Sequence, residues 1–211
     1  MRSAEEWKAV CRNITAGYTP DGKKEETYAS GVELAKLLSD LGVWKDGDRI
    51  VEIGSGNGRL AMGLYGHTVE YQGLEITEPC VTFCQAAFRG IPGFAFRHVD
   101  MKNGRYWYHG ALDPAKDSYP VEDGWADVVL ALSVFSHTGT LAVANHLYSE
   151  MVRIAKPGGL VFTTWYFGKP DESERKTVYD RSAVNHLFTG LQWEKALPPK
   201  DSSQTGILCR T

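Results

Sequence analysis

Cysteine is scarce in this chain of 211 residues. The four cysteines, Cys11, Cys80, Cys84 and Cys209, match neither a disulfide framework nor a zinc site. The six histidines show no paired spacing of the kind that metal ligands have. We therefore expect reduced thiols in a cytoplasmic protein, and no bound metal.

The sequence also lacks basic clusters and long apolar runs. No run of Lys and Arg exceeds two residues and the net charge is −3, whereas binding to a nucleic-acid backbone needs a basic surface. No apolar run approaches the roughly 18 residues of a membrane span, and the charged N-terminal residues are unlike a signal peptide. We expect a small-molecule substrate, with neither nucleic acid nor membrane as partner. The oligomeric state stays open.

The composition is that of an ordinary globular domain, and its most informative stretch runs from Arg49 to Thr77. Residues 50–53 are typical of a buried strand, a G-x-G-x-G loop occupies 54–58, and a helix and a second strand follow. Glycine permits positive φ and lets a ligand approach the backbone closely. Glu75, near the end of the second strand, can accept hydrogen bonds from both hydroxyls of a ribose. This order predicts the first half of a doubly wound nucleotide-binding fold.

The glycine pattern differs from that of dinucleotide-binding loops. A G-x-G-x-x-G/A loop that starts at Gly54 would need glycine or alanine at position 59, where this sequence has Arg59. The observed pattern is E-x-G-x-G-x-G, starting at Glu52, and it resembles motif I of the class I S-adenosylmethionine (SAM)-dependent methyltransferases. An ordinary glycine-rich turn is the alternative, and Glu52 and Glu75 at the right offsets argue against it.

Further features match the same family in the right order. Asp100 follows a predicted third strand over 94–99, and an R-x-x-K-P-G-G turn over 153–159 precedes a fifth strand over 160–166. The resemblance implies an α/β fold with a doubly wound, Rossmann-like sheet of about seven strands. Most strands are expected to be parallel and the last antiparallel, with helices on both faces. It also implies a single methyltransferase domain over 1–211, with residues 1–28 as an N-terminal arm or lid.

Hydrophobic periodicity and capping residues place the other elements. Helices are predicted over 29–41 with Gly42 as the cap, from Thr77 to Gly90, from Thr140 to the Lys156 turn, and over 173–188 with Ser173 as the cap. Further strands are predicted over 128–132, 192–197 and 206–210, the last two as a closing hairpin.

The resemblance implies SAM as cofactor and S-adenosylhomocysteine as product. In this family the glycine loop faces the amino-acid part of the cofactor, and residues after the fourth strand border the methionine end. An acid or another polar residue after the third strand contacts the adenine amino group. Carried over to this sequence, the expected cofactor-binding residues are Glu52, Gly54, Ser55, Gly56, Asn57, Gly58, Glu75, Ile76, Asp100, Met101 and Ser133.

Residues 102–124 form no periodic element and are long for a βα connection. The stretch is rich in aromatic residues, and long loops at the ligand edge of α/β sheets are often functional. Anchoring of the loop to the body of the protein is the alternative. Together with the N-terminal arm and the ends of the fourth and fifth strands, it supplies the expected substrate-binding residues, which are Tyr18, Tyr28, Tyr106, His109, Phe135 and Trp165.

His137 is the candidate general base, because it follows the fourth strand on the ligand side and histidine titrates near neutral pH. Packing at the start of the next helix is the alternative. The run SVFSH over 133–137, with a loose N-x-x-Y match at Asn103 and Tyr106, also resembles a subgroup of small methyltransferases. We predict methyl transfer from SAM to a small-molecule hydroxyl or amine. An NAD(P)-dependent oxidoreductase and a non-catalytic SAM-binding subunit of a partner enzyme remain alternatives.

Overall fold

The computed structural model describes residues 24–169, 176–197 and 204–211, with side chains from Ser30 onward. The described residues form a seven-stranded sheet in the order β3-β2-β1-β4-β5-β7-β6. The strands are β1 (Arg49–Ile53), β2 (Glu70–Glu75), β3 (Phe94–His98), β4 (Ala126–Ala131), β5 (Ala155–Tyr166), β6 (Leu191–Ala196) and β7 (Gln204–Arg210). Strands β1 to β5 pair in parallel, and β7 lies antiparallel between β5 and β6. The predicted sheet, with its antiparallel last strand, is confirmed.

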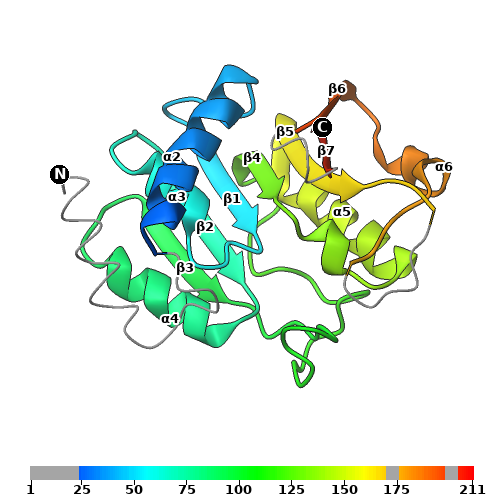
Figure 1. The fold of residues 1–211 in the computed structure, drawn as a ribbon, viewed down its shortest axis with the longest axis horizontal. Helices are drawn as coiled ribbons and strands as arrows, with labels where there is room; N and C mark the ends of the chain where they lie inside the picture. The colour runs from blue at the N-terminus through cyan, green and yellow to red at the C-terminus, as the bar shows by residue number, and fades with distance from the viewer. Residues whose placement is uncertain (1–23, 170–175, 198–203) are drawn as a thin grey trace.

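Helices cover both faces of this sheet (Figure 1). They are α2 (Lys24–Asp40), α3 (Arg59–Leu64), α4 (Glu78–Ala87), α5 (Leu141–Ile154) and α6 (Arg181–Val184), with short 3-10 helices η2 (Phe135–His137) and η3 (Asn185–Leu187). Residues of α2, α3 and α4 share one hydrophobic core with the sheet. Residues of α5, α6 and η3 share the other. The sheet is therefore buried on both sides, as parallel strands require.

Two helix ends agree with the capping residues in the sequence. Gly42 has a φ of 72° and its amide donates to the Ser39 carbonyl, which ends α2. Thr140 precedes α5, and its hydroxyl accepts a hydrogen bond from the Val143 amide. The first helix begins at Lys24, earlier than expected, so the last residues of the predicted arm belong to α2.

The helix predicted over 173–188 is wrong over residues 176–180, and α6 and η3 occupy only residues 181–187. Helix α6 begins only at Arg181, after Asp180, and residues 176–180 are not helical. The Thr177 amide donates to the Ser136 carbonyl, and the Tyr179 amide donates to the Tyr166 carbonyl. These amides therefore find their hydrogen-bond acceptors in distant segments and not within a helix. The expected cap Ser173 lies outside the described residues.

The K-P-G-G segment was predicted as a turn before the fifth strand, and the structure places it inside β5. Ala155 already pairs with Ala126, and the register shifts before Leu160 pairs with Val128. The extra residues form a bulge, with Gly158 at a φ of 76°.

Candidate active site

The glycine loop follows β1 at the carboxyl edge of the sheet. Its glycines, Gly54, Gly56 and Gly58, have φ angles of 76°, 51° and 75°, a region that side chains disfavour. A Cβ atom at Gly54 would lie 2.5 Å from Val134 Cγ2. Because β1 and β4 are neighbours in the sheet, the loop packs directly against the segment that follows β4.

Glu75, at the end of β2, is tied to this loop. Its carboxylate accepts a hydrogen bond from the Gly56 amide at 2.9 Å on Oε2. On Oε1 it accepts from the Thr77 amide at 2.8 Å and the Thr77 hydroxyl at 2.6 Å. Thr77 occupies the N-cap position of α4 as predicted, but its hydroxyl serves Glu75 instead of the helix. A carboxylate offers about four acceptor sites, so these three donors fix its orientation and leave one site open.

Glu52 is fully buried next to Tyr71, whose hydroxyl donates to Glu52 Oε2 at 2.5 Å. Burial raises the pKa of Glu52 to about 7, against the hydrogen bond from Tyr71 and the positive charge of Arg59, which both lower it. The buried Ser55 hydroxyl has no hydrogen-bond partner among the described residues. Asn57 and Ile76 are half-buried in the same region.

Asp100, after β3, already has partners within the chain. Its Oδ1 accepts from the Trp107 indole at 2.7 Å, and its Oδ2 accepts from the Ala111 amide at 3.2 Å. The hydrogen bond from Trp107, and then that from Ala111, lowers the pKa of Asp100. The neighbouring Met101 is buried in the core, and its backbone pairs with Leu112. Both residues therefore hold the base of residues 102–124, which we call the aromatic loop.

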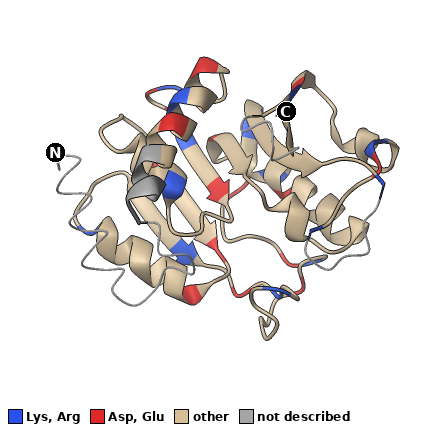
Figure 2. Ribbon diagram, viewed as in Figure 1, with Lys and Arg blue, Asp and Glu red and all other residues tan. Residues whose placement is uncertain are grey.

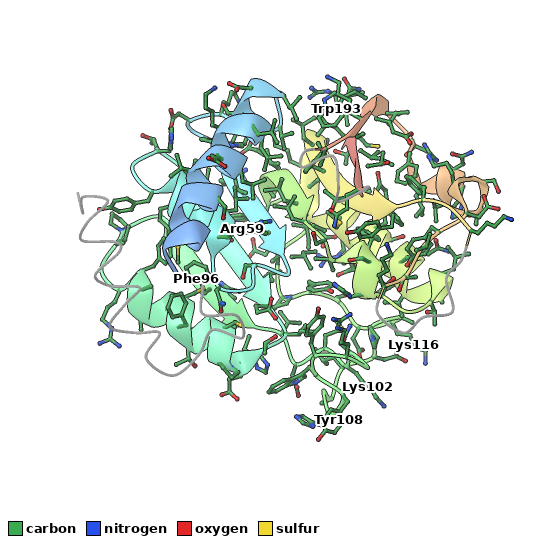
Figure 3. The ribbon with its side chains drawn as sticks, in the orientation of Figure 1. Arg59, Phe96, Lys102, Tyr108, Lys116 and Trp193 are labelled. Atoms are coloured by element: carbon green, nitrogen blue, oxygen red, sulfur yellow. The ribbon has the colours of Figure 1, made fainter. Side chains whose placement is uncertain are left out.

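The aromatic loop carries the groups that surround His137. Asn103 accepts from the amides of Arg105 and Tyr106 at 3.0 Å, and its own amide nitrogen donates to the His137 carbonyl at 3.0 Å. His109 does not join this group, because its ring packs edge-on against Trp107. Tyr108 points away from the protein at the tip of the loop (Figure 3).

His137 lies in η2, where its ring meets Tyr106 edge-to-face with the centroids 5.1 Å apart. The Tyr106 hydroxyl is 3.4 Å from His137 Nε2. Burial lowers the pKa of His137, and the positive charge of Arg105 lowers it further. The imidazole is therefore neutral at neutral pH, which is the form that accepts a proton.

The comparison with family models decides the class. A model described as a methyltransferase domain matches residues 51–163, from β1 into β5, which is more than half of the chain. This chain belongs to the methyltransferase family that the model describes. The oxidoreductase alternative is therefore set aside for this methyltransferase.

Known proteins similar to this methyltransferase include curated relatives and many solved structures. Protein-L-isoaspartate O-methyltransferase 1 of Cupriavidus necator is 26% identical over 193 residues, which cover 82% of this chain and 66% of the relative. The chain thus spans just under two thirds of that relative's length. A SAM-dependent methyltransferase from Aquifex aeolicus matches with a TM-score of 0.60 at 15% identity, over 100% of this chain and 99% of the other. Geranyl diphosphate C-methyltransferase from Streptomyces coelicolor, solved with S-adenosylhomocysteine, matches with a TM-score of 0.59 at 12% identity, over 95% and 80%.

Two residues predicted to bind substrate in this methyltransferase are core residues instead. Phe135 and Trp165 are fully buried and stack with their ring centroids 3.9 Å apart. The Trp165 indole nitrogen donates to Thr163, so its polar atom is also satisfied inside the protein. Because Phe135 lies in η2 and Trp165 in β5, this stacking packs η2, which also contains His137, against the sheet. Tyr18 and the side chain of Tyr28 lie outside the described part of the chain.

The hydrogen-bond partners of Ser133 could not be predicted from the sequence. The Ser133 amide donates to the Thr164 hydroxyl at 2.7 Å, and its own hydroxyl is hydrogen-bonded to the Gln204 amide at 3.0 Å. Ser133 is the one residue besides glycine with a positive φ, 59°, among the residues that the structure describes. Gln204 is 71 positions away in the chain, and no local pattern links the two residues.

Among the described residues, neither the distribution of charge nor the placement of possible metal ligands indicates a second functional site. Basic and acidic residues are interspersed along the described part of the ribbon (Figure 2). Within the described ranges, no group of three or more His, Cys, Asp or Glu residues could hold a metal ion. None of the helices in the described segments is long and apolar enough to cross a membrane.

Proposed function

We propose that this methyltransferase transfers the methyl group of SAM to a hydroxyl group of a small molecule, with an amine as the second candidate acceptor. The observation that carries this proposal is His137, a neutral imidazole held at the carboxyl end of β4 by Asn103 and Tyr106. A hydroxyl is a weak nucleophile until its proton is removed, so a neutral imidazole in this position suits an oxygen acceptor.

The residues at the edge of the sheet fit the cofactor. Gly56 has open space where a Cβ atom would lie, so a ligand can approach the backbone there. The Glu75 carboxylate is already oriented, with one acceptor site open for a ribose hydroxyl. We propose that Gly54, Gly56 and Gly58 face the amino-acid part and that Glu75 binds the ribose. SAM supplies an activated methyl group, so the chain must align the acceptor and exclude water.

In this proposal His137 takes the proton of the acceptor hydroxyl on one ring nitrogen. Tyr106 keeps the ring in place through its edge-to-face contact and its hydroxyl near Nε2. The name of the Cupriavidus necator relative describes an O-methyltransferase, which supports an oxygen acceptor.

The decisive experiment compares His137→Asn and His137→Ala with the wild type on a panel of small alcohols, phenols and amines. Formation of S-adenosylhomocysteine gives the turnover, and calorimetry gives the affinity for S-adenosylhomocysteine. We expect turnover of hydroxyl acceptors to fall by about 10²–10⁴, with unchanged affinity. His186→Asn is the matched control, because that histidine is exposed in η3 and has no role in the proposed site.

Near-normal turnover in the His137 variants would remove the base role. A preference for amines that survives the substitutions would favour the second acceptor class. Full affinity for S-adenosylhomocysteine without turnover of any panel member would instead fit a subunit that acts with a partner enzyme.

A further inference from the structure

A cavity of about 610 Å³ lies between α2 and the face of the sheet formed by β4, β5 and β7. This volume is in the range of small-molecule sites, about 300–1,000 Å³. One wall is apolar and is built by Leu34, Leu37, Leu132 and Leu197. The cavity reaches Arg59, the first residue after the glycine loop, which lies beside α2 in the view of Figure 3. It is therefore next to the cofactor site and separate from the aromatic loop.

The polar end of this cavity is the group formed by Ser133, Thr164 and Gln204. All three lie at the carboxyl ends of β4 and β5 or at the start of β7, the same edge as the glycine loop. The left-handed backbone of Ser133 costs energy for a residue with a Cβ, and such strain gathers at ligand sites. Each of the three side chains carries a hydroxyl or amide group and none carries charge.

The charged residues that line the cavity balance each other. Arg59 and Glu33 are both exposed, and one contributes a positive and the other a negative charge. A ligand with a net charge would gain attraction from one residue and repulsion from the other. The lining therefore favours an uncharged molecule with a large apolar part.

We propose that this cavity binds the non-reacting part of the acceptor, and that the acceptor is an uncharged, largely apolar molecule. A hydroxyl or carbonyl group on it pairs with Ser133 and Gln204, while its apolar part lies along Leu34 and Leu37. This rests on the proposed function, since it names the substrate class for the same reaction. Binding at a distance from the reacting atom orients the acceptor and excludes water.

The test uses three probes with one apolar chain and different head groups: 1-octanol, octanoate and octylammonium. Saturation-transfer NMR on the full chain loaded with S-adenosylhomocysteine measures their dissociation constants. We expect 1-octanol to bind at least threefold more tightly than either charged probe. Tighter binding of octanoate or octylammonium would overturn the neutral class, and no binding of 1-octanol would overturn the cavity as a site.

Variants then locate the bound probe. Leu37→Trp fills the apolar wall, and Leu34→Trp serves as a second blocking variant if the first does not fold. Val32→Trp is the matched control, since Val32 is on the exposed face of the same helix. We expect 1-octanol binding to fall at least tenfold in the blocking variant only, with unchanged affinity for S-adenosylhomocysteine. Equal binding in the blocking and control variants would overturn the location.

A third variant tests the polar end. Gln204→Leu should reduce the preference for 1-octanol over the charged probes, and an unchanged preference would overturn the pairing with Ser133 and Gln204. Because these experiments measure binding and not turnover, their failure differs from failure of the proposed function, which the His137 variants report.

Discussion

The backbones of α2 and α3 meet at Gly31 and Gly63. A Cβ atom on Gly63 would lie 2.1 Å from the carbonyl oxygen of Gly31, and one on Gly31 would lie 2.2 Å from the carbonyl oxygen of Arg59. These distances are far below a normal contact, so the two helices cross at a separation that only glycine permits. The crossing fixes α2 against the helix that follows the glycine loop, and with it one wall of the cavity.

We expect Gly63→Ala to destabilise the protein by about 1–3 kcal/mol, the range of overpacked sites, because the new methyl group meets rigid backbone. Urea unfolding measures the change in the free energy of unfolding. Gly104→Ala is the control, since a Cβ atom there has open space around it. Equal stability of the two variants would contradict the close crossing.

Glu75→Gln should weaken binding of S-adenosylhomocysteine by about tenfold or more, which corresponds to about 1.4 kcal/mol. The amide replaces one acceptor oxygen with a donor, and that donor must face either Gly56 or Thr77, which are themselves donors. Calorimetric titration measures the affinity. Glu78→Gln, on the exposed first turn of α4, removes the same charge nearby and should leave the affinity unchanged.

Because Glu52 is a buried acid, we expect the free energy of unfolding of the cofactor-free protein to depend on pH. Its pKa is raised from 4.5 to about 7 by burial, so between these values the unfolded chain releases a proton that the folded protein keeps. The contribution of Glu52 to stability is therefore lost as pH rises through this window, by about 3 kcal/mol. The free energies of unfolding of the wild type and Glu52→Gln should diverge by that amount between pH 4.5 and 8. Glu70→Gln, on the exposed end of β2, is the control that removes a carboxylate from the surface. If the difference in free energy of unfolding between wild type and Glu52→Gln does not change with pH, the prediction for the buried acid is wrong.

Removal of the Arg105 charge is expected to shift the pH dependence of turnover. In the proposed mechanism the lowered pKa of His137 places the acidic limb of kcat/KM below pH 6.5, because the neutral imidazole is the form that takes the proton. Arg105→Gln removes the positive charge and should move this limb to higher pH, still below 6.5 because burial is the larger cause. Lys102→Gln removes a cation from the same loop and is the control. A limb that stays in place in the Arg105 variant would show that His137 is not the titrating base.

Much of the fold could be predicted because its signals are local. Buried β-branched runs mark β1 and β4, Gly42 and Thr140 mark helix ends, and the glycine loop needs backbone angles that only glycine adopts readily. The order of these signals along the chain also predicted the antiparallel last strand through the family resemblance.

The failures involve residues whose partners are distant in the chain. The segment before α6 has the composition of a helix but hydrogen-bonds to Ser136 and Tyr166 instead. Phe135 and Trp165 have the chemistry of a substrate site, and only the packing of η2 onto β5 shows that they are buried. The Trp107 indole that donates to Asp100 could not be predicted from the sequence, and the expected contact of Asp100 with adenine stays a prediction.

The order of most strands and helices, the glycine loop and the acid at the end of β2 follow from residues within a few positions of each other, so they can be read from the chain. The contact of Ser133 with Gln204, the hold of Asn103 and Tyr106 on His137, and the close crossing of α2 and α3 depend on the folded arrangement. These contacts join segments that become neighbours only when the strands pair into the sheet and the helices cover its faces. Such contacts form because the whole fold must bury apolar side chains and pair buried polar groups. A short stretch of sequence does not contain this information.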